Sequence, residues 1–290
     1  MNAVRVVAKP ASIVLAYIFI FAFLATIPGL TSRAAAKDTK SVRAVYDIGF
    51  NSFNIGSFTV ISDMSQSKYS VRARADISVL AGILFSWRGD TSSSGSVLAN
   101  RPSPDSYTFG YRTSDKRETI DIEFSNNNVK DVAISPPQRV SPSRVPITRK
   151  HMRNVVDPLS ALVMLTNIGS NKSSREVCTR RLPIFDGKAR YDLKLSYKKT
   201  KNVSTSHGYQ GPAYICKVKF VPIAGHKHGD KEARDAAQND NMEIWMIPLK
   251  EADLYVPYYI YIPTPAGTAS LTSSKFSVDN SDASRGARLQ

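Results

Sequence analysis

The two cysteines, Cys178 and Cys216, are the residues whose chemistry is easiest to anticipate. Thirty-seven residues lie between them in a chain whose first residues have the features of an export signal, and such a pair is typical of a disulfide. Closing that loop stabilises a fold by roughly 4 kcal/mol in the chain-entropy model. A plain three-strand meander over 178–222 would place the cysteines two strands, roughly 9.5 Å, apart, which is too far for a bridge. We therefore predict the disulfide and expect Cys178 to lie just outside the sheet, or the third strand to pair elsewhere.

The alternative for Cys216 is a catalytic thiolate with His207 as its base. Ser206-His207-Gly208 followed by Cys216 is similar to the Ser-His-Gly-Cys signature of L,D-transpeptidases, which are wall enzymes with a cysteine nucleophile. In that signature the cysteine directly follows the glycine, whereas here seven residues intervene. A bridged sulfur also has no thiolate to offer. A wall-modifying enzyme therefore remains the second hypothesis.

A weaker candidate site is a metal centre at His226, His228 and Asp230. Two imidazoles and a carboxylate are suitable ligands for zinc or copper, and alternating residues on a strand share a face. Gly225 and Gly229 flank the pair, however, and no third histidine is close. We expect a solvated loop here, with no metal and no cofactor.

Other catalytic motifs give no support for an enzyme. Ser65-Gln-Ser-Lys68 matches the Ser-x-x-Lys box of penicillin-binding enzymes, but Ser65 is expected in a polar turn and no Lys-Thr-Gly follows. The sequence has no Walker loop, dinucleotide glycine motif, zinc-protease helix motif or Gly-x-Ser-x-Gly elbow. We expect a protein that is not an enzyme.

Residues 1–36 have the features of a secretory signal peptide. Arg5 and Lys9 form a basic start, Ala11 to Leu30 is uncharged, and Ala34-Ala35-Ala36 supplies the small residues of a cleavage site before Lys37. The alternative is an uncleaved inner-membrane anchor, because the apolar core is at the long end for a signal peptide. In both cases the rest of the chain works outside the cytoplasm, so we expect a periplasmic protein.

The charge of the chain suggests its class of partner. Of the 39 basic residues only three lie in 1–36, where no acidic residue occurs, so 36 basic and 24 acidic residues remain, a net charge of +12. A basic exported protein is suited to anionic envelope components such as lipid headgroups or wall polymer. Nucleic acid would also explain the charge, but export makes it a poor partner. The charge does not indicate an oligomeric state.

Two-residue alternation of apolar and polar side chains dominates the chain and predicts strands with one buried face. In Tyr69–Val79 the odd positions are apolar or small, and in Tyr191–Tyr197 the polar residues, including Asp192, are expected to face outward. Turn residues such as Asn126-Asn-Asn128 and Asp186-Gly187 separate the strands. About ten short strands with such turns predict a mainly β fold, a strongly curved antiparallel sheet that is open or spiral and barrel-like. The remaining expected strands are Val42–Phe50, Phe53–Ser62, Ser106–Arg112, Thr119–Phe124, Val129–Ile134, 178–185, Ala213–Pro222, Glu243–Leu249, Tyr258–Ile262 and Ala269–Val278.

One buried helix is expected within a single β-rich domain of residues 37–279. Asp157 is a suitable N-cap, Pro158 suits the first helical position, and Leu159 to Ile168 is nearly all apolar until Gly169. A helix that is apolar all round is buried, most simply against the concave face of the sheet. We also predict a second short helix at Val79–Trp87, a linker at Ser135–Pro146 and a disordered tail at 280–290.

Several motifs resemble one protein family. They are Val156-Asp157-Pro158-Leu-Ser-Ala-Leu162, Leu182-Pro-Ile-Phe185-Asp186-Gly187-Lys188 with Arg190-Tyr191-Asp-Leu193, and Gly211-Pro-Ala-Tyr-Ile-Cys216 followed by Phe220-Val-Pro222-Ile-Ala-Gly225. Together with Tyr46–Phe50, they resemble the domain of unknown function family 3108, exported proteins of Gram-negative and especially alphaproteobacterial cells, over residues 42–278. The resemblance implies a periplasmic β-rich fold, with Asp157, Pro158, Phe185, Asp186, Gly187, Tyr191, Pro222 and Gly225 as structural motif residues, and implies no established activity.

These observations favour a binding or scaffolding role in maintenance of the cell envelope. A curled sheet can hold a lipid or a hydrophobic peptide on its concave face, provided that the face is not filled by its own side chains. A third hypothesis is a membrane-tethered assembly factor that keeps residues 11–30.

Overall fold

The computed structural model describes residues 39–79, 85–98, 101–138, 141–166, 172–205 and 208–280. The expected signal peptide, His207, Gly169 and, apart from Asn280, the expected tail lie outside these residues.

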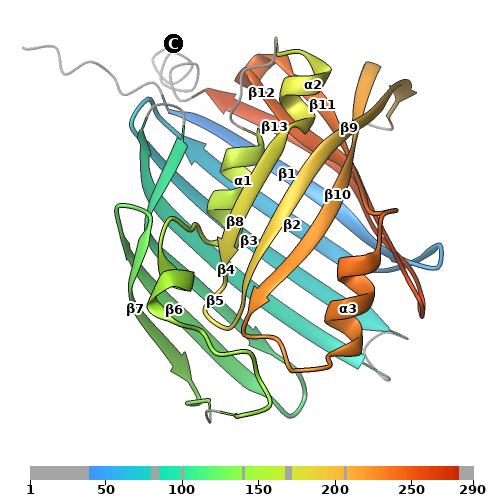
Figure 1. The fold of residues 1–290 in the computed structure, drawn as a ribbon. Helices are drawn as coiled ribbons and strands as arrows, with labels where there is room; N and C mark the ends of the chain where they lie inside the picture. The colour runs from blue at the N-terminus through green and yellow to red at the C-terminus, as the bar shows by residue number, and fades with distance from the viewer. Residues whose placement is uncertain are drawn as a thin grey trace, which may run out of the picture. The chain divides into compact units, whose positions relative to one another are not determined.

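One antiparallel sheet accounts for the fold (Figure 1). Its 13 strands follow the order β7-β6-β5-β4-β3-β2-β1-β13-β12-β11-β10-β9-β8, so that β7 and β8 are its edges and the sheet is open. The strands are β1 (Lys40–Phe50), β2 (Phe53–Met64), β3 (Lys68–Val79), β4 (Phe85–Leu98), β5 (Arg101–Arg112), β6 (Arg117–Ser125), β7 (Asn128–Ser135), β8 (Arg180–Phe185), β9 (Arg190–Ser204), β10 (Gln210–Ala224), β11 (Glu243–Leu249), β12 (Leu254–Thr264) and β13 (Gly267–Asn280).

The expected mainly β, strongly curved and open antiparallel sheet is confirmed. The alternation also identified the buried face: Tyr69, Val71 and Ala73 on β3 and Ile120 and Ile122 on β6 are all buried. This agreement arises because a strand with one wet face must place its apolar residues at every second position. The pairing of β1 with β13 brings the two ends of the described chain together in the middle of the sheet.

Tight turns join neighbouring strands, at the expected Asn126–Asn128 and Asp186-Gly187 and also at Asn51-Ser52, which the sequence motifs did not single out. Asn126 and Asn127 have φ angles of 51° and 59° between β6 and β7, and Asn51 and Ser52 have φ angles of 47° and 71° between β1 and β2. Positive φ angles at both central residues give the turn a twist that matches the right-handed twist of the strands. Asparagine tolerates positive φ angles better than most residues do. Between β8 and β9, Gly187 has a φ of 94°.

Helix α1 (Pro158–Thr166) begins at the expected cap Asp157 and lies against the concave face of the sheet, in contact with β3, β4, β5, β8 and β12 (Figure 1). Helix α1 is apolar on opposite faces because each face packs against a different buried cluster. Leu159 and Val163 join one buried cluster, and Ala161 and Leu165 join another. The helix therefore fills the space between the edge strand β8 and strands β3–β5 on the facing part of the sheet.

Several elements differ from the expectations. The helix expected at Val79–Trp87 is wrong where the structure describes it: Val79 ends β3 and Phe85–Trp87 begins strand β4. Strand β4 was missed because its inward positions include Ser93 and Gly95 in place of large apolar residues. The short helices η1 (Arg149–Met152), α2 (Ser174–Cys178), η2 (Lys250–Ala252) and α3 (Lys231–Gln238) were also missed, since they are short or mostly polar.

Asp192 is a further correction. It was expected to face solvent on β9, but its side chain is 2% exposed and forms ion pairs with Arg190 and Arg181 at 2.6 and 2.7 Å. Alternation indicates two faces of a strand but not whether the polar face is covered, and here two arginines cover it.

Candidate functional site

The buried carboxylate of Asp157 organises the start of α1. One of its oxygens accepts hydrogen bonds from the backbone N–H groups of Leu159 and Ser160, both at 2.9 Å. The other accepts from the hydroxyls of Ser160 and of Ser93 on β4. Tyr69 on β3 contacts the Ser160 hydroxyl at 2.6 Å. The expected cap residue thus also attaches the helix to two strands of the concave face.

Burial of Asp157 makes stability depend on pH. Desolvation raises the pKa of this carboxyl above its usual value, although its four hydrogen bonds oppose the shift. Because the folded state binds the proton more tightly, the contribution of Asp157 is most favourable at low pH and is lost as pH rises through the folded pKa.

Substitutions of Asp157 should separate the stability that its N-cap hydrogen bonds contribute from the effect of its buried charge. We expect Asp157→Ala to lower the free energy of unfolding by about 2 kcal/mol, because an N-cap is lost and two buried hydroxyls lose an acceptor. Asp157→Asn keeps the cap and should cost less than about 1 kcal/mol. Urea unfolding measured over a range of pH tests both. The stability of the native protein relative to Asp157→Asn should rise as pH falls from neutrality, and an unchanging difference would contradict the argument.

The other family-motif residues gather where the β8–β9 turn reaches the opposite end of the sheet. Phe185 is buried and ends β8, while the Asp186 carboxylate accepts from the N–H groups of Lys188 and Ala189 at 2.8 and 2.7 Å. Gly187 lies against β6, where an added Cβ would meet Ile120 at 2.5 Å. Lys188 also forms an ion pair with Glu118 at the start of β6. The β8–β9 turn at one edge of the sheet therefore contacts β6, which lies next to the opposite edge.

The remaining motif residues support this turn from β9 and β10. Tyr191 pairs with Pro222 in the ladder and packs against Phe220 with ring centroids 5.3 Å apart. Gly225 has a φ of 90°, and an added Cβ would meet the carbonyl oxygen of Lys188 at 2.1 Å. These contacts give the motif residues packing roles.

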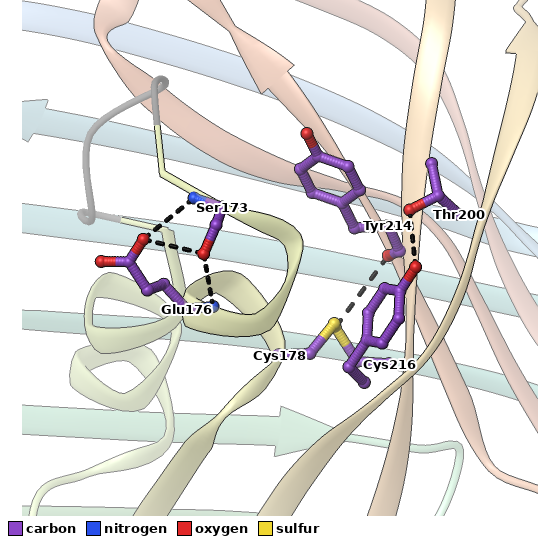
Figure 2. Close-up of a disulfide and its surroundings, with 7 residues drawn as sticks. Ser173, Glu176, Cys178, Thr200, Tyr214 and Cys216 are labelled. Carbon is purple, nitrogen blue, oxygen red and sulfur yellow. Dashed lines mark hydrogen bonds between the residues drawn. A yellow bond between two sulfur atoms is a disulfide. The ribbon is translucent and has the colours of Figure 1, made fainter.

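The predicted disulfide joins Cys178 to Cys216, with the Cα atoms 5.1 Å apart (Figure 2). Strands β8, β9 and β10 do form a meander, and the bridge is possible because Cys178 ends helix α2, just outside the sheet. A capping box between Ser173 and Glu176 begins that helix. With its sulfur bonded, Cys216 offers no thiolate, and the suggested base His207 lies outside the described residues.

The residues of the suggested metal site do not converge. Asp230 is the N-cap of α3, and its carboxylate accepts from the backbone N–H groups of Glu232 and Ala233. His226 lies in the loop after β10, beside the segment around Arg144. Within the described ranges, no three His, Cys, Asp or Glu side chains are placed to hold a metal ion together.

The concave face is mainly packed core. An apolar pocket of about 80 Å³ remains between Leu162 and Thr166 of α1 and strands β1, β2, β12 and β13. Pockets for drug-sized ligands occupy roughly 300 Å³ or more, so a whole lipid chain does not fit while α1 stays in place.

An arginine-lined groove of about 1050 Å³ runs across the outer face of β1–β6, and the sequence alone did not reveal it. Strand register places Arg88, Arg112 and Arg117 directly opposite one another on β4, β5 and β6. We call these three residues the arginine row. The groove is also lined by Arg43, Arg72 and Arg74.

Ion pairs neutralise only part of this groove. Arg72 pairs with Asp63 at 3.2 Å, Arg74 with Asp90 at 2.6 Å, and Arg88 with Asp76. Arg112 and Arg117 are exposed and make no ion pair with any other residue of the described chain. Like charges directly opposite each other destabilise a sheet. The arginine row therefore needs an explanation other than folding.

A comparison with solved structures agrees with this fold. One matching structure, entitled "Crystal Structure of Beta-barrel-like Protein of Domain of Unknown Function DUF1849 from Brucella abortus", shares 12% identity with a TM-score of 0.52, covering 84% of this chain and 100% of the other. At this identity the likeness concerns the fold alone. The comparison with curated proteins found no match.

Among the helices that the structure describes, none has the length and apolar character needed to span a membrane.

Residues 45–273 match the family model described as "Protein of unknown function (DUF3108)". This span reaches from β1 to β13 and includes the disulfide and all eight family-motif residues from Asp157 to Gly225. The resemblance seen in the sequence is thereby confirmed, and the chain belongs to the DUF3108 family.

Proposed function

We propose that this protein is exported to the periplasm and there, without catalysing a reaction, binds a phosphate-bearing anionic component of the cell envelope through the groove on its outer face. The observation that carries the proposal is the arginine row. Three guanidinium groups at cross-strand spacing face solvent in one line, and two of them have no ion-pair partner in the described chain.

Arginine suits this role for a geometric reason. Its planar guanidinium donates two parallel hydrogen bonds to a phosphate and keeps its charge at every physiological pH. Directly opposite residues on neighbouring strands lie roughly 5 Å apart, so one or two phosphates can bridge adjacent arginines of the row. Binding would relieve the mutual repulsion of the arginines, which otherwise lowers the stability of the unliganded sheet.

The net charge of +12 expected for residues 37–290 supports the same class of partner, because a basic surface is attracted to anionic lipid headgroups or wall polymer. The disulfide is consistent with an oxidising compartment. A hydrophobic ligand finds less support, since the pocket beside α1 has room only for the end of a chain.

The double variant Arg112→Ala/Arg117→Ala should bind anionic vesicles about 30-fold more weakly than the native protein, at about 1 kcal/mol for each arginine near the surface. The protein is purified from the periplasm, and its binding to vesicles of mixed phosphatidylglycerol and phosphatidylcholine is measured by co-sedimentation. Mass spectrometry of the same protein sample should find an N-terminus at Lys37. Binding should weaken as salt is added, because screening reduces attraction between exposed charges.

A matched control removes two other exposed arginines with the same loss of charge. Arg149 and Arg153 lie at helix η1, outside the groove, and Arg149→Ala/Arg153→Ala should bind nearly as well as the native protein. Equal losses of vesicle affinity in the two variants would mean that net charge alone accounts for binding, and would contradict a binding site at the groove. A second arm with purified wall sacculi distinguishes wall polymer from lipid as the source of the anion.

A further inference from the structure

A second opening on the described chain has a different chemistry. It is a groove of about 810 Å³ between strands β12 and β13 and the β1–β2 turn. One wall consists of Tyr259 and Tyr261, and its floor carries Ser270, Thr272 and Asp47. We call it the tyrosine groove.

The aromatic wall is held in a fixed orientation. Tyr259 and Tyr261 stand two residues apart on β12, so they share a face, and their rings stack with centroids 6.3 Å apart and planes 30° apart. Trp245 on β11 packs edge-on against Tyr259 at 5.5 Å, and the ammonium of Lys201 lies 5.5 Å from the Trp245 ring. Both tyrosines remain partly exposed. The result is a wall of two tyrosine rings whose surfaces are not fully covered.

The floor of the groove presents polar side chains. Asp47 pairs in register with Thr272, and Gly49 pairs with Ser270. Within the described ranges, the side chains of Asp47, Ser270 and Thr272 make no hydrogen bond or ion pair with one another or with other residues. Gly49 keeps the floor open, because an added Cβ there would meet the Ser270 hydroxyl at 2.6 Å. One carboxylate and two hydroxyls are therefore available to a ligand.

The β1–β2 turn forms the other wall of the tyrosine groove and is hydrogen-bonded to β13. In Figure 1 the blue tip of this turn lies near the red β12–β13 tip. The N–H of Asn51 donates to the carbonyl of Thr268 at 2.9 Å, and the N–H of Thr268 donates to the Asn51 side chain at 2.8 Å. At Gly267 an added Cβ would meet that side chain at 2.3 Å. Both walls are thus positioned before any ligand arrives, which lowers the entropy cost of binding.

We propose that the tyrosine groove binds a neutral carbohydrate. A sugar ring presents C–H groups on its face, which are attracted to the electron-rich face of an aromatic ring, and hydroxyls at its rim, which pair with carboxylates and side-chain hydroxyls. Two stacked tyrosines beside one carboxylate and two hydroxyls provide both kinds of contact. This proposal is independent of the anion site, since it uses other residues and a ligand without charge.

Isothermal titration of the native protein with chitotriose, maltotriose and cellotriose tests the proposal. We expect saturable binding of at least one trisaccharide that is unaffected by added salt, in contrast to binding at the arginine row. Tyr259→Ala and Tyr261→Ala should each weaken it tenfold or more, whereas Tyr259→Phe should retain most of the affinity because the ring remains. Tyr197→Ala is the matched control, because Tyr197 is 38% exposed and is not among the groove residues.

A blocking variant makes the test independent of folding defects in the alanine variants. Asp47 is exposed, so Asp47→Tyr should fold normally, as judged by thermal unfolding, and should abolish binding by filling the groove. The proposal is overturned if none of the three sugars binds, or if binding survives in Asp47→Tyr and in both tyrosine-to-alanine variants.

Discussion

Replacing Cys178 and Cys216 together with alanine should lower the free energy of unfolding by about 4 kcal/mol. The bridge closes a segment that contains 37 intervening residues, including β8, all of β9 and the start of β10, and it therefore restricts the unfolded chain strongly. Both cysteines are fully buried, and the bridge attaches helix α2 to β10. The large effect follows from chain entropy, because the bridge removes conformations from the unfolded state.

Urea unfolding with and without a reductant provides the measurement and its control. Reductant should shift the native protein to about the stability of the double variant and should leave the variant unchanged. If the native protein already contains titratable thiols before reduction, or if reductant does not alter its midpoint, the stabilising role assigned to the bridge is wrong.

Asp192→Ala should destabilise the protein by about 3–5 kcal/mol, because it leaves the charge of Arg190 without its carboxylate in a site shielded from water. The Arg190 side chain is only 9% exposed, whereas Arg181, the second partner of Asp192, is 65% exposed and can be solvated. Arg190 also donates to the carbonyl of Tyr191, which holds it beside the strand.

A double-mutant comparison separates the buried charge from the loss of contacts. Arg190→Met/Asp192→Leu removes both charges and should cost less than Asp192→Ala alone, since replacing a buried pair by apolar residues is often close to neutral. Glu123→Ala, which breaks an exposed pair with Lys130, should cost less than about 1 kcal/mol. Urea unfolding of the variants gives these differences, and equal costs for Asp192→Ala and Glu123→Ala would refute the argument.

Much of the local structure could be predicted from the order of residues. Alternation in Tyr69–Val79 identified both a strand and its buried face, the asparagines at 126 and 127 identified a tight turn, and Asp157-Pro158 identified the start of the helix. Each of these signals depends on neighbours within a few residues, because backbone preferences, capping and the two faces of a strand are local properties. Strand β4 escaped prediction for the same reason, since its serines and glycines carry no local signal.

The candidate sites depend on pairings that no local pattern contains. Arg88 and Arg112 lie 24 positions apart in the sequence, and Asp47 and Thr272 lie 225 positions apart, yet the ladders place each pair side by side. The sequence by itself determined which residues alternate, where the chain turns and that two cysteines were available to pair. Only the tertiary structure decided which strands are neighbours and in what register, because pairing depends on the packing of the whole sheet around α1. A shift of one residue in that register would move every side chain to the other face and remove both the arginine row and the tyrosine groove.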